Sequence, residues 1–159
     1  MRNSSRKYKR TVLRVVIASL ACSCAVVEAS GPVLPLGAVQ IAAPPEYAEW
    51  HRKTTTCSGL YGEFKALQWY VVPGVSTFAT SRGPQVGMWE NRGGIHRIII
   101  AGQYGGNEMV VRHEILHALL GRAGHPASYF VSRCHLTWES WDGSTAATEL
   151  PGHDGTAAH

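Results

Sequence analysis

Residues 107–121, NEMVVRHEILHALLG, are the most informative stretch of the 159-residue chain. Asn107 is a favourable N-cap residue, because its side-chain oxygen can accept a hydrogen bond from a free backbone N–H of the first helical turn. Gly121 suits the left-handed conformation that commonly ends a helix. The stretch therefore predicts a helix over residues 108–120. Because apolar side chains lie almost all the way round this helix, we expect it to be buried at the centre of the domain.

Within that helix, His113, Glu114 and His117 form an HExxH motif. Residues four apart in a helix lie on the same face, so both imidazoles can bind one metal ion. Glu114 is rotated by about 100° from His113, so it is placed to take a proton from a metal-bound water rather than to bind the metal. The motif thus predicts a Zn²⁺ site in which His113 and His117 are ligands and Glu114 is the general base.

This helix, preceded by predicted strands and followed by a glycine, resembles the active-site helix of the zincin metallopeptidases. The resemblance covers residues 68–125. It implies a small sheet packed against the helix, a zinc cofactor, and hydrolysis of a peptide or protein substrate by a zinc-activated water. The segments CSGL (57–60) and WYVVPG (69–74) are also similar to small exported bacterial proteins.

The third metal ligand is predicted from the residues that follow the motif. Metzincins continue as HExxHxxGxxH, with a glycine three residues and a histidine six residues after the second histidine. Here Gly121 lies four residues and His125 eight residues after His117. The glycine and the histidine both lie further from the second histidine than in metzincins, as expected if the helix is one residue longer before Gly121 ends it. We therefore expect His125 to be the third ligand.

Other third ligands remain open in the sequence. Glu139 lies 22 residues after His117, near the spacing at which gluzincins supply a glutamate. His135 and Asp142 are further candidates. No methionine follows the helix, so the Met-turn of the metzincins is absent.

Periodicity and turn residues predict the elements around this helix. A first helix is expected at residues 46–57, after two prolines that suit a helix start. Strands are expected at 64–72, 86–90 and 95–101, the last two joined by the turn NRGG (91–94), and a short helix at 129–133. The predicted fold class is α+β, a small, mostly antiparallel sheet with the buried HExxH helix and a flanking N-terminal helix.

The zincin resemblance implies two further roles. In zincins the edge strand before the active-site helix pairs with the backbone of the substrate, and residues 95–101 occupy that place in this sequence. Tyr129, four residues after His125, is a candidate donor to the oxyanion that forms during hydrolysis.

Two cysteines, Cys57 and Cys134, remain once the predicted signal peptide is set aside. An even number of cysteines in an exported protein predicts a disulfide between them. The bridge would close a loop of nearly 80 residues, which is worth about 4 kcal/mol on the chain-entropy account.

The N-terminus indicates export. Residues 1–10 are strongly basic, residues 15–27 are an apolar run, and Val27-Glu28-Ala29 offers small residues at a cleavage site. These features together are typical of a secretory signal peptide. Cys22 lies in a sequence similar to a bacterial lipobox, so a lipid anchor at this residue is the alternative, and the one predicted contact with a membrane.

The charge distribution argues against nucleic acid as a partner. The formal charge is +4, but six of the 15 basic residues lie in the first 29 positions. The rest of the chain carries nine basic against ten acidic residues, with no basic stripe to follow a phosphate backbone.

The sequence therefore predicts a signal peptide at residues 1–29, a Pro-rich linker at 30–45, a zincin-like catalytic domain at 46–141 and a disordered tail at 142–159. The leading hypothesis is an exported zinc-dependent metallopeptidase. The alternative is a non-catalytic envelope or secreted binding module, in which a fourth protein ligand would make the metal site structural.

Overall fold

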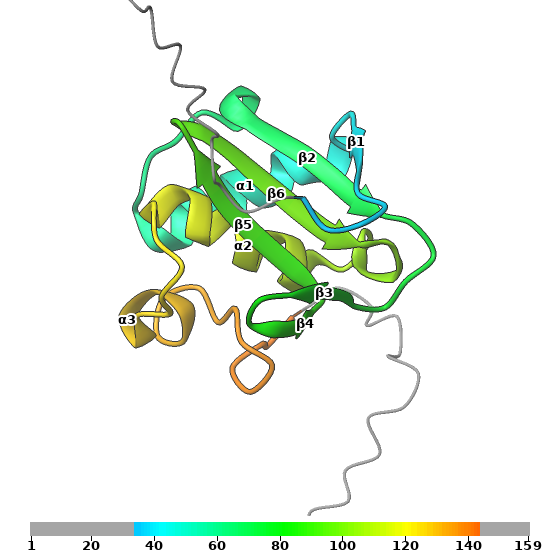
Figure 1. The fold of residues 1–159 in the computed structure, drawn as a ribbon. Coiled ribbons are helices and arrows are strands. Elements are labelled where there is room, and N and C mark those ends of the chain that lie inside the picture. Colours follow the sequence, from blue (N-terminus) through cyan, green and yellow to red (C-terminus); the bar gives the residue numbers. More distant parts are fainter. Residues whose placement is uncertain (1–33, 144–159) are drawn as a thin grey trace, which may run out of the picture. The chain divides into compact units, whose positions relative to one another are not determined.

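The computed structural model describes residues 34–143, which form an α+β fold with a small, mostly antiparallel sheet, as the sequence predicts. Helices α1 and α2 cover the same face of this sheet (Figure 1). In chain order the elements are β1 (Val39–Ile41), α1 (Pro45–Ser58), the 3₁₀ turn η1 (Phe64–Ala66), β2 (Leu67–Val72), β3 (Phe78–Thr80), β4 (Gly83–Gln85), β5 (Gly87–Arg92), β6 (Ile95–Ala101), the 3₁₀ turn η2 (Gly102–Tyr104), α2 (Glu108–Leu120) and α3 (Ala127–Phe130).

The main sheet has the strand order β1-β2-β6-β5. β1 pairs with β2 and β5 pairs with β6 in antiparallel register, whereas β2 and β6 run parallel. Strands β3 and β4 form a separate antiparallel hairpin. Since β6 lies between β2 and β5, the edges of the sheet are β1 and β5.

Both faces of the central strands are buried. One face packs against α1 and α2 and carries Trp69, Ile98 and Ile100, while the other carries Tyr70 and Ile99. Phe78 of β3 belongs to the cluster on that second face. Burial on two sides explains why β6 reads as a nearly continuous apolar run, IHRIIIA, rather than as an alternating pattern.

Helix α2 has the ends that the sequence predicts. The side chain of Asn107 accepts a hydrogen bond from the backbone N–H of Val110 (3.1 Å), and Gly121 takes the left-handed conformation at φ 63°. Ten of the thirteen residues of α2 are buried, which confirms its central position.

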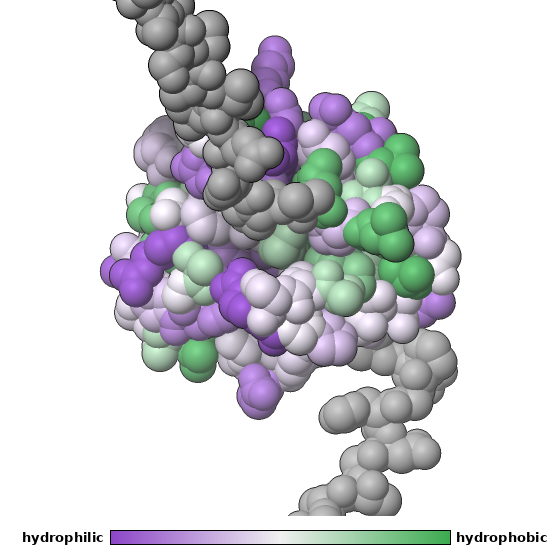
Figure 2. All heavy atoms as spheres, viewed as in Figure 1, coloured by the Kyte–Doolittle hydropathy of each residue, from purple (hydrophilic) through white to green (hydrophobic). Residues whose placement is uncertain are grey.

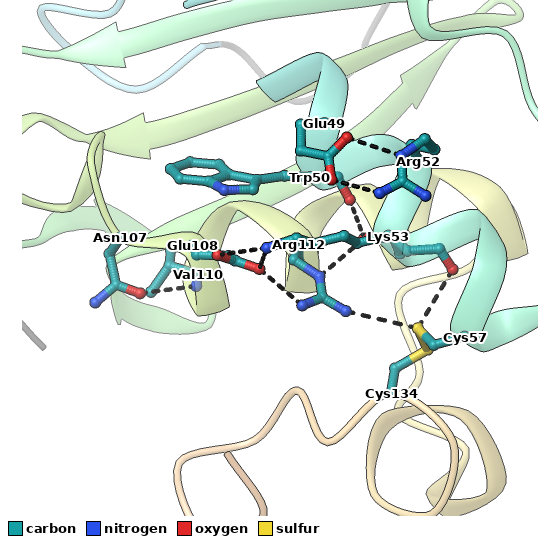
Figure 3. Close-up of polar contacts among 11 residues, drawn as sticks. Glu49, Trp50, Arg52, Lys53, Cys57, Asn107, Glu108, Val110, Arg112 and Cys134 are labelled. Carbon is teal, nitrogen blue, oxygen red and sulfur yellow. Dashed lines mark hydrogen bonds and ion pairs between the residues drawn. A yellow bond between two sulfur atoms is a disulfide. The ribbon is translucent and has the colours of Figure 1, made fainter. Parts of the chain in front are cut away.

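The interface between α1 and α2 buries charges in pairs (Figure 3). Glu108 accepts hydrogen bonds from Arg112 (2.9 Å) and from Lys53 of α1 (3.0 Å). The other end of the Arg112 guanidinium lies 3.7 Å from the sulfur of Cys57. Cys57 forms the predicted disulfide with Cys134, with a Cα–Cα distance of 5.2 Å. The ion pairs of Glu108 with Arg112 and Lys53 explain how the buried helix α2 can carry charged side chains, because a buried charge is costly when it is isolated.

One strand lies within the segment that the sequence assigns to a linker. Residues 39–41 form β1, and Gln40 pairs with Tyr70 of β2. The segment is extended as expected, but the prolines flank the pairing residues Val-Gln-Ile instead of interrupting them. The fold therefore includes residues upstream of position 46.

Other elements differ in detail from the prediction. The strand expected at 64–72 begins only at Leu67, after η1, and α3 lies at Ala127–Phe130 instead of 129–133. The β3–β4 hairpin was not predicted, because each strand has three residues and β4 contains Gly83 and Pro84, which disfavour strands.

The predicted signal peptide at 1–29, the cysteine at 22 and positions 144–159 lie outside the described residues. Within residues 34–143, no helix is long and apolar enough to cross a membrane. Leu36 and Val39 have exposed apolar side chains. Figure 2, in the same view as Figure 1, shows apolar residues gathered on the surface near β1.

Candidate metal centre

Three histidines come together beside the middle and second half of helix α2. His113 and His117 lie one turn apart on α2, and the chain reverses after Gly121 to bring His125 back to them. The Nε2 atoms are 2.9 Å apart for His113 and His125, 3.1 Å for His117 and His125, and 3.2 Å for His113 and His117. The ring of Phe130 lies below all three imidazoles, with centroids 4.7–4.9 Å apart.

Backbone carbonyls orient two of these rings. The Nδ1 atom of His113 lies 2.7 Å from the carbonyl oxygen of Leu136, and that of His117 lies 2.9 Å from the carbonyl oxygen of Arg122. A carbonyl can only accept, so each Nδ1 donates its hydrogen. In a neutral imidazole this leaves Nε2 with a lone pair, and both lone pairs point to the same place. Such second contacts are typical of metal-binding histidines.

The spacing of the nitrogens fits a small metal ion. With Zn–N bonds of about 2.0–2.1 Å, tetrahedral ligand nitrogens lie about 3.3 Å from one another. The observed Nε2 separations of 2.9–3.2 Å are close to this value. Two lone pairs facing each other without a cation would repel, so the arrangement itself calls for one. Three imidazole ligands also leave a fourth tetrahedral position open, as in catalytic zinc sites.

Burial keeps the three rings neutral. Desolvation lowers the pKa of His113 to about 4 and the pKa of His117 to about 3, and it also lowers the pKa of His125. A metal binds the neutral imidazole. All three ligands are therefore in the binding form near pH 7.

Glu114 lines the same pocket as the three histidines, and its side chain lies against Gly87 of β5. Its side chain is buried, and desolvation raises the pKa of its carboxyl to about 8. The positive charge of Arg82 and a hydrogen bond from the backbone N–H of Trp89 act in the opposite direction and stabilise the carboxylate. A cation held by the neighbouring histidines would act in the same sense as Arg82.

The histidines and Glu114 open into one pocket of about 180 Å³. Its wall is completed by β5 and by the β3–β4 hairpin. The residues that line it are Arg82, Gln85, Gly87, Met88, Trp89, His113, Glu114, His117, Ala123 and His125.

The strand beside this pocket is β5, not β6. We expected residues 95–101 to be the edge strand that meets a substrate, and this is wrong, because β2 and β5 pair with β6 on both sides. The backbone N–H of Ala101 in β6 donates to the carbonyl oxygen of Val86. In an antiparallel pair of strands, every second residue forms such hydrogen bonds with the partner strand. The backbone N–H and C=O groups of Gly87 and Trp89 therefore point away from β6. The bond from Trp89 to Glu114 agrees with this direction.

The other predicted site residues are not brought to the pocket. Cζ of Arg133 lies over the ring of Tyr129, 4.9 Å from the centroid of that ring, and Tyr129 does not line the pocket. Glu139 and Asp142 are exposed, and neither they nor His135 join the three histidines. Of the proposed third ligands, the structure therefore places only His125 with the HExxH pair.

Arg82 and Gly87 are functional candidates that the sequence analysis missed. Gly87 lies directly against Glu114, and Arg82 lies on the turn of a hairpin that was itself not predicted. The only signal in the sequence is the turn SRG at 81–83, and nothing local connects it with the HExxH helix.

Gly87 makes room for the carboxylate of Glu114. A Cβ atom at position 87 would lie 2.7 Å from Oε1 and 2.9 Å from Cγ of Glu114. We expect Gly87→Ala to displace the carboxylate. For the hydrolysis that the sequence predicts, a misplacement of about 1 Å typically lowers turnover by about 100-fold, while metal binding by the three histidines should stay unchanged. The measurements are steady-state kinetics and zinc content. The control is Gly106→Ala, the same change at an exposed glycine where an added Cβ meets nothing within 4 Å. Full activity in Gly87→Ala would show that the position of Glu114 is unimportant.

Comparisons of the chain with protein-family models, with curated proteins and with solved structures find no match.

Proposed function

We propose that the protein is a zinc-dependent metallopeptidase. The observation that carries this proposal is the convergence of three neutral Nε2 atoms next to a buried carboxylate in one open pocket. His113, His117 and His125 would hold the metal. When bound, zinc supplies a Lewis acid that polarises a carbonyl and activates a water for attack.

Glu114 is the proton carrier of the proposed reaction. Its carboxylate accepts the proton of the attacking water and then passes it to the leaving amine of the cleaved peptide bond. The backbone N–H of Trp89 stabilises the carboxylate form, and the absence of a side chain at Gly87 leaves room for its Oε1. Burial raises the pKa of the Glu114 carboxyl to about 8, near neutral pH. A carboxyl group with such a pKa can both accept and donate a proton efficiently.

Within residues 34–143, the edge of β5 that faces away from β6 pairs with no other strand, and it is the proposed binding place for the substrate backbone. The backbone groups of Gly87 point away from β6 on the side of the pocket. An extended peptide can add to such an edge as a further strand. The substrate is therefore proposed to be a peptide or protein in extended conformation.

The proposed location is outside the cytoplasm, in the envelope or the medium. The Cys57–Cys134 disulfide supports this, because disulfides persist mainly in oxidising compartments. A lipid anchor at Cys22 remains the alternative to a cleaved signal peptide.

The rival hypothesis, a binding module with a structural metal, has less support. A structural zinc site needs four protein ligands. Among residues 34–143, the group that can hold a metal contains three.

Metal content is the first test of the proposed function. Purified protein expressed with oxidation allowed should hold about one zinc per chain, as a single site implies. His125→Ala should weaken zinc binding by more than about 100-fold, because the loss of outer contacts alone costs about 10- to 100-fold. Glu139→Ala, which removes an exposed carboxylate from the same part of the chain, is the matched control and should bind zinc as the wild type does.

Peptide hydrolysis is then measured on the zinc-loaded protein with a mixed peptide library. Cleavage that stops on chelation and returns with zinc supports the proposal. A folded sample that holds no zinc near pH 7, or a zinc-loaded protein that cleaves no peptide, contradicts it.

A further inference from the structure

Arg82 is an exposed cation that lines the pocket. It lies on the β3–β4 turn, where its backbone N–H donates to Oγ1 of Thr80 (3.1 Å) and the same hydroxyl donates to the carbonyl of Gly83 (2.8 Å). Gly83 has φ 101°, a conformation that favours glycine. The turn therefore holds the backbone of Arg82 while its side chain lines the pocket.

The hairpin that carries Arg82 is anchored to the domain. Phe78 of β3 is 6% exposed and packs with the apolar face of the sheet that is opposite α2. Gln85, at the other end of the hairpin, lines the same pocket as Arg82. The hairpin is thus a wall of the pocket, with one positive and one amide side chain.

The charge of Arg82 is available to the pocket, because no carboxylate of the described residues neutralises it in an ion pair. None of the ion pairs within residues 34–143 involves Arg82. It lines the same pocket as Glu114, His117 and His125.

The pocket as a whole favours an anion. Three neutral imidazoles would leave the charge of a divalent ion unbalanced, and Glu114 is the one acidic residue that lines the pocket. Arg82 adds a further positive charge at the entrance. A pocket lined in this way concentrates negatively charged ligands.

We propose, on the basis of the function above, that Arg82 binds a carboxylate of the substrate within one residue of the scissile bond. A guanidinium binds a carboxylate through two parallel hydrogen bonds, which gives direction as well as energy. The volume of about 180 Å³ is below the roughly 300–1,000 Å³ of sites for drug-sized ligands. There is room for about one residue, so the carboxylate must be either the C-terminal carboxyl group or an acidic side chain.

Binding of matched probes tests this selectivity without turnover. The protein is the Glu114→Gln variant, and the probes are N-acetyl-dialanine, its carboxamide, and N-acetyl-alanyl-aspartyl amide. Titration calorimetry is done with and without one equivalent of zinc, so that the result does not depend on metal binding. We expect at least one carboxylate probe to bind about 10- to 100-fold more tightly than the carboxamide, the range of a charged hydrogen bond.

The two carboxylate probes distinguish the sources of the anion. Tight binding of N-acetyl-dialanine indicates a C-terminal carboxyl group, and tight binding of the aspartyl amide indicates an acidic side chain. Adding Arg82→Gln should remove the preference, and Arg82→Lys should restore part of it. Arg52→Gln, which removes an exposed arginine of α1 that does not line the pocket, should leave it unchanged.

Equal binding of all three probes, or a preference that survives Arg82→Gln, overturns the role of Arg82. Neither result affects the peptidase proposal, which is tested by cleavage. Conversely, a protein that cleaves no peptide but shows the Arg82-dependent preference contradicts the peptidase proposal and leaves an anion-binding pocket.

Discussion

Replacing Glu114 with glutamine is expected to abolish measurable peptide hydrolysis while zinc stays bound. General acid–base catalysis contributes about 10²- to 10⁴-fold to rate, and glutamine cannot accept the proton of the attacking water. The amide has nearly the same shape as the carboxylate and can still accept the hydrogen bond from Trp89. The proposed zinc site should therefore be intact, because the group that could hold the metal consists of His113, His117 and His125 and does not include Glu114.

This experiment compares kcat/KM and zinc content for the wild type and Glu114→Gln. Glu139→Gln makes the same chemical change at an exposed position outside the pocket, and it should match the wild type in both measurements. If Glu114→Gln turned over substrate within a few-fold of the wild-type rate, this would contradict the proposed mechanism. Loss of zinc would show that Glu114 acts on the metal site and not on the proton.

Removing the disulfide is expected to have the second large effect, on stability and on metal affinity together. The cysteines are 77 residues apart in sequence, so the bridge contributes about 4 kcal/mol to the free energy of unfolding on the chain-entropy account. Cys134 is also two residues from Leu136, whose carbonyl orients His113. Without the bridge to Cys57 of α1, which Figure 3 shows, this segment loses its covalent link to that helix.

The variant is Cys57→Ser/Cys134→Ser, and both quantities are measured on it. Denaturant unfolding should show the loss of about 4 kcal/mol. Zinc affinity, measured where circular dichroism shows the variant folded, should fall by about 10- to 100-fold, as it does when a contact behind a ligand is lost. An unchanged zinc affinity in the folded variant would show that the disulfide has no influence on the site. An unchanged free energy of unfolding would contradict the stabilising role.

The sequence predicts those parts of the fold that local signals specify. Helix α2 has the predicted ends because Asn107 and Gly121 act on their own neighbours in the chain. The internal position of β6 depends instead on pairing with β2, a contact between distant segments that periodicity does not report. For the same reason the segment at 39–41, polar on one side and flanked by prolines, could be recognised as extended but not as a strand of the sheet.

The site divides in the same way. His113, Glu114 and His117 are predicted because helical spacing alone places them together, and His125 follows because Gly121 ends the helix and lets the chain return. Gly87 matters only through its contact with Glu114, which belongs to another element. Such a contact exists only in the folded chain, so no rule of spacing could have identified this glycine.

The carbonyl oxygens that orient two of the three imidazole rings have a consequence for how this site can evolve. The partners of His113 and His117 are main-chain atoms of Leu136 and Arg122. Every amino acid carries that carbonyl, so no single substitution can delete either acceptor. Selection can therefore change the exposed side chain at position 122 while the imidazole keeps its orientation. The arrangement makes the geometry of the centre tolerant of genetic drift around it, and it concentrates the mutational sensitivity on the histidines themselves.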